Sequence, residues 1–270
     1  MPARKRSPSR GRAKAGDSSA AGRSRSSKSK ASARDAPLWE GSLLQPRVWW
    51  FFLLVVGGGT IAVRRWHASV HGGNNVWHSL LGFFLVLNSM IAYTELNLFF
   101  RSARIAERAA VLTPRFAGGQ REWRSAARYF MLPLTLENIW SDVWAEMWAA
   151  YAVFDPCYAD TSSFGFWIDT FNGFTTLLPS LALIYNMTYD IAWITPRTMA
   201  FLQALVFWNE FVGTVVYAAQ FTYHKLPGKI GWKNTVLFVV LTNGLWAVLP
   251  VIGIATMKVV VEENSFALFR

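Results

Sequence analysis

The sequence is poor in charged residues. Asp, Glu, Lys and Arg make up 16% of its 270 residues, whereas about 25% is usual in soluble proteins. Hydrophobic residues make up 53%, and the chain contains 14 Trp and 20 Phe. A soluble chain of this composition would expose large apolar patches to water. The composition therefore indicates an integral membrane protein.

Cysteine and histidine are also scarce. The one cysteine, Cys157, excludes an intrachain disulfide framework and any metal site built from several cysteines. None of the four histidines has a metal-ligand spacing with another His, Cys or acidic residue. We expect solvated or interfacial imidazoles at all four: His67, His71, His78 and His224. The sequence also has no Gly-rich phosphate-binding loop and no nucleophile elbow, so we expect neither a metal nor a cofactor.

The positive charge is concentrated at the N-terminus. Residues 1–35 hold 11 Lys or Arg and 2 acidic residues, so they carry +9 of the net charge of +11. The remainder of the chain carries only +2, which excludes a nucleic-acid-binding domain there. Residues 1–36, dominated by Ser, Gly, Ala and basic residues, are predicted to be a disordered tail. We interpret the tail as solvated and as an aid to orientation, with contact to RNA or to anionic lipid as alternatives.

Five segments are long and apolar enough to cross a bilayer as helices, which takes about 17–25 residues each. They are residues 47–63, 76–100, 164–185, 198–222 and 234–260. We therefore predict an all-α membrane protein with a five-transmembrane-helix bundle. The first helix and its connection occupy residues 37–75, the main bundle occupies 76–261, and a C-terminal tail occupies 262–270.

The connection between the second and third spans, residues 101–163, has two unlike halves. Its first half is rich in arginine: Arg101, Arg104, Arg108, Arg115, Arg121, Arg124 and Arg128. Its second half contains Trp140, Trp144 and Trp148, which at a spacing of four lie on one face of a helix. Because Trp is enriched at membrane surfaces, we expect an interfacial helix in this half.

The distribution of basic residues predicts the orientation. With a cytosolic tail, five spans place residues 101–163 and 223–233 on the tail's side of the membrane. That side then holds 22 of the 27 Lys and Arg residues. Since basic connections favour the cytosolic side, we predict a cytosolic N-terminus and a lumenal C-terminus.

Three acidic residues lie within the predicted spans: Glu95, Asp169 and Glu210. An ionisable group at mid-membrane is costly, so it faces the bundle interior and is a candidate functional residue. Asparagines accompany the acids: Asn88, Asn97, Asn172, Asn209 and Asn243. No Lys or Arg falls inside the second to fourth spans, so buried ion pairs do not account for all the carboxylates. The plainer alternative is that the acids only join helices through hydrogen bonds.

Carboxylates in an apolar, aromatic pocket are suited to a lipophilic molecule that carries or develops positive charge. The carboxylates attract the cation, and Trp faces add cation–π stabilisation. A carboxyl that is held protonated by desolvation can act as a general acid while a neighbouring carboxylate acts as the base. The acids thus favour either acid–base chemistry on a lipid or the binding of a lipophilic cation.

Three ordered motifs in the C-terminal two-thirds resemble one membrane protein family. The first is Met147-Trp-Ala-Ala-Tyr-Ala-Val-Phe-Asp155-Pro-Cys-Tyr158, followed eleven residues later by Asp169. The second is Gly213-Thr-Val-Val-Tyr217, and the third is Thr242-Asn243-Gly-Leu-Trp246-Ala-Val-Leu-Pro250. Together they resemble the W-x-x-Y-x-x-x-D-x-x-Y, G-x-x-x-Y and N-x-L-W-x-x-x-P patterns of the emopamil-binding protein family. The resemblance covers about residues 76–261.

The resemblance implies a fold of EXPERA type: a five-helix, multi-pass protein of the endoplasmic reticulum membrane that forms a homodimer and whose helical bundle closes a sterol-sized cavity. That family includes the sterol delta-8/delta-7 isomerase, which needs no cofactor, and the sigma-two receptor. The isomerase protonates a ring double bond, passes through a carbocation and removes a proton from a neighbouring carbon. A sterol or a related lipophilic molecule in the bilayer would be the substrate.

The resemblance matches Asp169 and Glu95 to the family's third-span and second-span acids, which are predicted to be catalytic. Glu210 stands where the isomerase has a Gln and is predicted as a third catalytic residue because it is an acid in the middle of a span. The predicted substrate-binding residues are Asn172, Asn243, Trp246 and Tyr217, which belong to matched positions or motifs, and Asn88, which shares the face of Glu95. The isomerase has a histidine one turn before its second-span acid, where this chain has Ile91.

The sequence leaves three interpretations. The first is a sterol isomerase of the cholestenol delta-isomerase type, and the second is a non-catalytic protein that binds or moves sterols or lipophilic amines, as in the receptor branch. Ile91 favours the second, because it cannot carry a proton. The third, an unrelated small transporter or scaffold, predicts internal repeats, and none is visible in the sequence.

Overall fold

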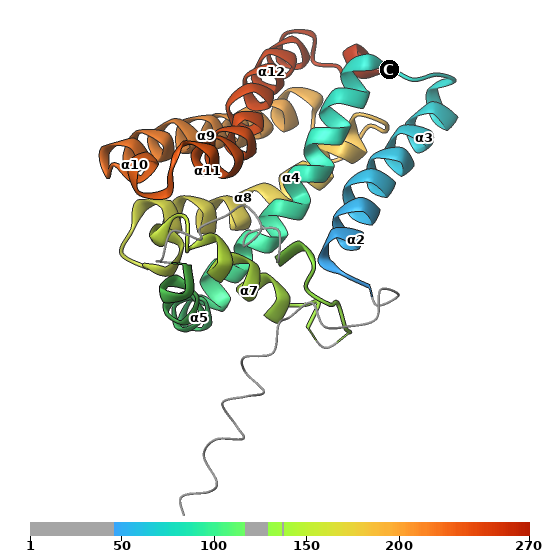
Figure 1. Ribbon diagram of the computed structural model, residues 1–270. Helices are drawn as coiled ribbons and strands as arrows, with labels where there is room; N and C mark the ends of the chain where they lie inside the picture. The colour runs from blue at the N-terminus through green and yellow to red at the C-terminus, as the bar shows by residue number, and fades with distance from the viewer. Residues whose placement is uncertain (1–45, 117–128, 137) are drawn as a thin grey trace, which may run out of the picture. The chain divides into compact units, whose positions relative to one another are not determined.

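The computed structural model describes residues 46–116, 129–136 and 138–270, all within the unit Leu38–Arg270 (Figure 1). The regular secondary structure of these residues is helical, and their only β-type pairing is an isolated bridge between Arg47 and Pro133. This confirms the all-α prediction for the described part of the chain. The predicted tail, residues 1–36, lies outside the described residues.

Four helical segments among the described residues are long and apolar enough to cross a membrane. The first runs from Val48 to His71 and consists of α2 (Val48–Phe52), a π-helical turn η1 (Leu53–Gly58) and α3 (Gly59–His71). The others are α4 (Val76–Phe100), α9 (Pro196–Tyr223) and α12 (Leu241–Glu263). The chain is therefore a helical membrane protein by length and composition. Helix α8 (Phe164–Asn186) has the required length but is not among the four, so the fifth span stays a prediction.

Capping residues explain where these helices begin and end. The Asn75 side chain accepts hydrogen bonds from two backbone N–H groups in the first turn of α4. Ser163 and Thr195 cap α8 and α9 in the same way. Pro196 occupies the first position of α9, where its missing N–H costs nothing. Gly72 ends α3 in the left-handed conformation that glycine adopts without strain.

Two pairs of helices make the most extensive contacts: α4 with α8, and α9 with α12. Helix α8 also packs along α9 and so joins the pairs, whereas α12 contacts α4 only slightly. In Figure 1, α9 and α12, in orange and red, run side by side. The space between the weakly contacting faces of α12 and α4 is where the site described below is found.

The described part of the arginine-rich half forms the helix α5 (Ser102–Phe116). The Trp-containing half holds α7 (Asp142–Tyr151) and the 3-10 turn η2 (Pro156–Ala159). Trp140 precedes α7 and is 72% exposed, whereas Trp144 and Trp148 on α7 are buried. The Trp144 ring packs on Phe51. The Trp face of α7 is thus turned into the protein, because aromatic neighbours from α2 and α4 cover it.

The last predicted span is not one continuous α-helix. It is preceded by the short α10 (Leu226–Ile230) and includes α11 (Trp232–Thr235), a π-helical turn η3 (Val236–Val240) and α12. Pro250 lies inside α12. After α12 the chain turns at Asn264 and ends in the 3-10 turn η4 (Ala267–Phe269), whose Phe269 is fully buried.

Two of the four histidines are buried, so the expectation of solvated or interfacial rings is wrong for them. His67 of α3 and His78 of α4 are each 1% exposed. Their rings stack with centroids 3.6 Å apart, and Nδ1 of His67 lies 3.2 Å from Oγ1 of Thr188. The short turn between α3 and α4 brings the two rings together, and their burial follows from packing that sequence spacing does not show.

Candidate functional site

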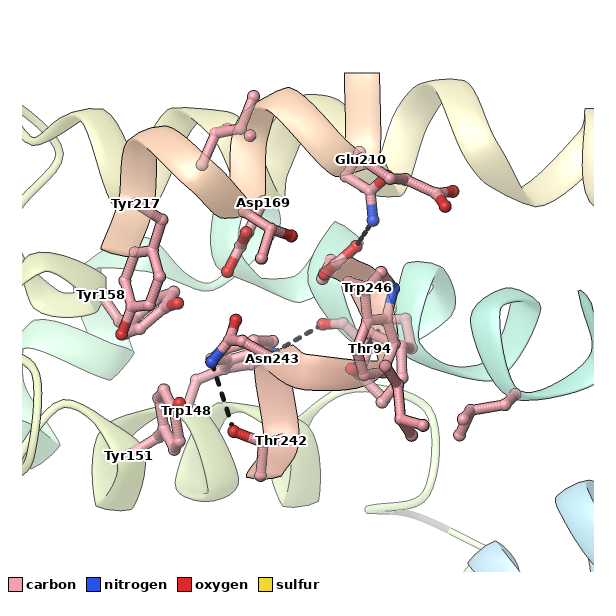
Figure 2. A pocket seen from close by; sticks show the side chains of 18 of the residues that line it. Thr94, Trp148, Tyr151, Tyr158, Asp169, Glu210, Tyr217, Thr242, Asn243 and Trp246 are labelled. Carbon is pink, nitrogen blue, oxygen red and sulfur yellow. Dashed lines mark hydrogen bonds between the residues drawn. The ribbon is translucent and has the colours of Figure 1, made fainter. Parts of the chain in front are cut away.

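A cavity of about 430 Å³ lies between α4, α7, α8, α9 and α12 (Figure 2). This volume falls in the range of pockets that enclose drug-sized molecules. Of the residues predicted from sequence, those that line the cavity are Glu95, Asn172, Asp169, Glu210, Tyr217, Asn243 and Trp246. Asn88 is not part of the lining and lies behind it. The fold thus gathers the predicted residues from four helices around one space.

Glu95 on α4 is 5% exposed and is held by α8. Its Oε2 accepts a hydrogen bond of 2.6 Å from Nδ2 of Asn172. Asn172 in turn accepts a hydrogen bond of 2.6 Å at Oδ1 from Oγ1 of Thr176, one turn further along α8. This chain fixes the Asn172 amide so that its N–H group points at the carboxyl of Glu95.

Glu210 on α9 is held from the opposite side by α4. Its Oε1 accepts a hydrogen bond of 2.6 Å from Nδ2 of Asn88, and Oδ1 of Asn88 accepts one of 3.0 Å from Nε1 of Trp246. Oγ1 of Thr176 lies 3.5 Å from the same Glu210 oxygen. The other oxygen, Oε2, is buried without a hydrogen-bond partner among the described residues. Asn88 therefore positions both the Glu210 carboxyl and the Trp246 ring.

Asp169 lies on α8 nearer to the aromatic end of the cavity. The Tyr158 side chain from η2 lines the cavity beside it. Asn243 faces the same region, and its Nδ2 donates to the carbonyl of Val239 at 2.9 Å. Figure 2 shows Asp169, Tyr158 and Tyr217 grouped at one end and Glu210 and Trp246 at the other.

The walls of the cavity are apolar and aromatic. Phe52, Phe130, Met147, Trp148 and Leu245 belong to the lining. No Lys, Arg or His is present among the described lining residues, so the three carboxyl groups face this space without a basic neighbour in the wall. Carboxylates in such apolar surroundings attract a positive charge more strongly than they would in water.

Tyrosines at the aromatic end keep their protons. Burial raises the pKa of Tyr158, and the nearby Asp169 and Tyr217 raise it further. Burial also raises the pKa of Tyr151, whose side chain lies in the same wall. Both phenols therefore act as hydrogen-bond donors near neutral pH. Within the described ranges, there is no group of three or more His, Cys, Asp or Glu side chains that could hold a metal ion.

Comparison of the chain with protein-family models, with curated proteins and with solved structures found no match.

Several residues of the site are not among those predicted from sequence. Thr176, which holds Asn172 in place, lies one turn after it and two turns after Asp169, so helical spacing was a signal that could have found it. Trp148, whose Nε1 donates to the carbonyl of Thr94 at 2.9 Å, belongs to the first motif. The contribution of Phe52 and Phe130 to the lining carries no sequence signal, because it depends on how the first span and the α5–α7 connection fold against the bundle.

Proposed function

We propose that this protein is a membrane sterol isomerase of the delta-8/delta-7 (cholestenol delta-isomerase) type. The observation that carries the proposal is the set of three carboxyl groups, from Glu95, Asp169 and Glu210, around one aromatic cavity whose described lining has no basic residue. A reaction through a carbocation needs negative charge in a dry site, placed before the positive charge develops. It also needs one group that gives a proton and another that takes one.

The residues divide into proton-transfer and charge-stabilising groups. Glu95 and Asp169 are the proton-transfer pair: one protonates the ring double bond, and the other removes a proton from a neighbouring carbon. Glu210, with one oxygen unpartnered among the described residues, stabilises the cation between these steps. The Trp246 ring adds cation–π stabilisation, worth about 2 kcal/mol or more in a desolvated site.

The remaining predicted residues orient these groups and the sterol. Asn172 donates to Glu95, and Asn88 donates to Glu210 while it accepts from Trp246. Asn243 and Tyr217 line the cavity and bind the substrate. The family resemblance supports these roles, because residues of all three motifs belong to the lining of one cavity.

One observation favours a second function, the non-catalytic binding or trafficking of sterols or lipophilic amines. Ile91, which stands where the isomerase has a histidine, is itself part of the cavity lining. An aliphatic side chain there cannot shuttle a proton, and Asn88 behind it is engaged with Glu210 and Trp246. Such a site would bind a cationic mimic of the carbocation without turning over a sterol.

We place the protein in the endoplasmic reticulum membrane, with a cytosolic N-terminus, as a homodimer. Four apolar helices support membrane location in general. The compartment, the orientation and the dimer follow from the resemblance and from the distribution of basic residues.

Sterol profiling by mass spectrometry in yeast that lacks its own delta-8/delta-7 isomerase tests the function. We expect the protein to convert accumulated delta-8 sterol to the delta-7 product. Asp169→Asn should lower conversion at least about 100-fold, since general acid–base catalysis contributes about 10²–10⁴. The matched control is Glu262→Gln, which changes an exposed carboxylate on α12.

Equal expression and membrane insertion of all variants is required for this comparison. If the wild-type protein inserts and binds a lipophilic amine but converts no sterol, the isomerase proposal is wrong and the binding protein is the better interpretation. Conversion by Asp169→Asn at the wild-type rate would remove Asp169 from the proton-transfer pair.

A further inference from the structure

The wall of the cavity is incomplete on one side. Among the described residues that line it, three are exposed, and all three lie at the start of α12: Leu241, Thr242 and Leu245. Leu241 is 59% exposed and Leu245 is 39% exposed, so each of these side chains contacts both the cavity and the outside of the protein. The start of α12 is therefore one edge of an opening.

Helix α4 forms the facing edge of this opening. Trp246 joins α12 to α4, because its Nε1 donates to Oδ1 of Asn88 at 3.0 Å. Next to Asn88 on α4, Leu87 belongs to the cavity lining, and Ile91 does so one turn further along. Both are half-buried, whereas the other lining residues of α4 are buried. The opening thus lies beside the Trp246 contact, between Leu87 and Ile91 on α4 and the exposed leucines on α12.

The surface around the opening belongs to the apolar part of a membrane-spanning helix. The last span contains no Asp, Glu, Lys or Arg between Lys233 and Lys258. At about 1.5 Å per residue, Leu241 lies roughly 12 Å beyond Lys233 along the helix, which is within the depth of the hydrocarbon core. Exposed side chains near it are apolar as well: Leu237, Val240 and Val248. The opening therefore faces the acyl chains of the bilayer.

We propose that this opening is a lateral portal, through which a lipophilic ligand passes between the acyl chains of the bilayer and the carboxyl groups of the cavity. The inference rests on the proposed function only in that the cavity takes a lipophilic molecule, which the isomerase and the binding protein have in common. Such a molecule partitions into the bilayer, and by this route it reaches the carboxyl groups without crossing water.

The size of a side chain at the edge of a portal affects the barrier to passage more than the bound state. The carboxyl groups that attract a cation lie on α4, α8 and α9, whereas Leu241 is on α12 and more than half exposed. Its size should therefore change the association and dissociation rates by the same factor and leave the dissociation constant, which is their ratio, almost unchanged. A residue that binds the ligand, or one with a merely structural role, would shift the dissociation constant instead.

The binding kinetics of a tritiated steroidal tertiary amine test the portal, with the full-length protein in phosphatidylcholine nanodiscs. We expect Leu241→Trp to slow association and dissociation at least about fivefold each, with a dissociation constant within about twofold of the wild type. Leu241→Ala should raise both rates. The matched control is Val248→Trp, which places the same side chain at a 58% exposed position of α12 outside the cavity lining and should equal the wild type.

A second variant separates the portal from folding. Leu241→Cys supplies an exposed thiol for N-(1-pyrenyl)maleimide, a bulky lipophilic reagent, whereas the native Cys157 is buried. Labelling before the amine is added should exclude the amine, and labelling after it has bound should trap it. Because the same labelled protein is compared in both orders, loss of folding cannot produce the trapping. Val248→Cys and the wild type, treated in the same way, should bind and release the amine freely.

The outcomes distinguish the portal from the function on which it rests. Wild-type rates in Leu241→Trp, with free exchange of the amine in labelled Leu241→Cys, would overturn the portal and leave the proposed function intact. Equal slowing by Val248→Trp would do the same, because the effect would then belong to the outer surface of α12. A wild-type protein that inserts but neither binds the amine nor converts sterol would overturn the proposed function, and the portal with it.

Discussion

At the scale of single residues, the crossing of α4 and α8 depends on Gly173. A Cβ at this position would lie 2.9 Å from the backbone nitrogen of Leu96 and 3.0 Å from the carbonyl oxygen of Ala92. Both atoms belong to the α4 backbone, which cannot move aside as the end of a side chain can. The contact holds α8 against the turn of α4 that carries Glu95.

Gly173→Ala should therefore destabilise the protein by about 1–3 kcal/mol, the usual cost of overpacking. Because a Cβ at Gly244 would have no neighbouring atom within 4 Å, Gly244→Ala is the matched control and should be neutral or slightly stabilising. Thermal unfolding in detergent measures both, at about 2–4 °C for each kcal/mol. An unchanged melting temperature for Gly173→Ala would show that the helices separate without cost.

The acids of the site could be predicted from sequence because an ionisable side chain in an apolar span is unstable in lipid and therefore faces the interior of the helical bundle. Glu95, Asp169 and Glu210 all line one cavity. Their roles in catalysis stay a prediction. The partners of these acids could not be assigned in the same way, since Asn88 and Thr176 acquire theirs only when α4, α8 and α9 have packed.

At the scale of helices, ion pairs between arginines of α5 and acidic residues of α7 join these two helices. Nη1 of Arg104 lies 3.0 Å from Oδ1 of Asp142, and Nε of Arg108 lies 2.7 Å from Oε1 of Glu146. The Arg108 and Glu146 side chains are 24% and 15% exposed, so water screens this pair only in part. Since α7 carries Trp148 into the cavity wall, these ion pairs support the site from outside.

Reversing the charge of Arg108 should reduce stability more than removing the charge of an exposed residue on the same helix. We expect Arg108→Glu to destabilise the protein by roughly 1–2 kcal/mol, between the values for exposed and buried pairs. Adding Glu146→Arg in the same chain should recover at least half of the lost melting temperature. Glu107→Gln, an exposed neighbour on α5, serves as the control. A double variant no more stable than Arg108→Glu would contradict the pairing.

The helices themselves were predicted well where an apolar run ended in a capping residue. The predicted span 76–100 coincides with α4, and the prediction 198–222 falls inside α9. Helix α5 was missed because its arginines dominate the composition, although Ile105, Ala109 and Leu112 recur at helical spacing and pack into the core. The π-helical turn η3 has no sequence signal, since every residue in it is compatible with an ordinary helix.

At the scale of the whole described unit, the end of the chain is tied to the segment between α8 and α9. Arg270 donates to both carboxylate oxygens of Asp190, at 2.7 and 3.2 Å. Phe266 and Phe269 are buried in the same core as Leu81 and Phe84. Residues predicted as a C-terminal tail thus close one end of the helical packing.

Stability should depend on pH through Asp190. The hydrogen bonds from Arg270 hold the pKa of Asp190 below its usual range. A carboxyl whose pKa is lower in the folded state favours folding when it is ionised. Its contribution is therefore complete above the unfolded pKa of about 4 and is lost as the pH falls through the folded-state pKa.

Asp190→Asn tests this dependence. The variant should melt below the wild type at pH 7, and the difference should shrink as the pH is lowered past about 4, where protonation of the Asp190 carboxylate begins to remove its contribution. A difference in melting temperature that stays constant between about pH 7 and about pH 3 would show that the ion pair does not contribute.

Which helices pack against each other could not be predicted from the sequence. An apolar span shows that a helix is buried in lipid or protein, but the contact of α4 with α8 and of α9 with α12 depends on close-packed surfaces such as that at Gly173. The burial of His67 and His78 depends likewise on how α3, α4 and the last turn meet.

The π-helical turn η3 has a consequence for how such a site can arise or be lost. A π-helical turn closes its hydrogen bonds over one residue more than an α-helix does, so η3 absorbs one extra residue within Val236–Val240. Deletion of one residue inside η3 should therefore restore a regular α-helix and leave Asn243 and Trp246 facing the cavity. The same deletion between Asn243 and Trp246, inside α12, would rotate Trp246 by about 100° relative to Asn243 and separate the two lining residues.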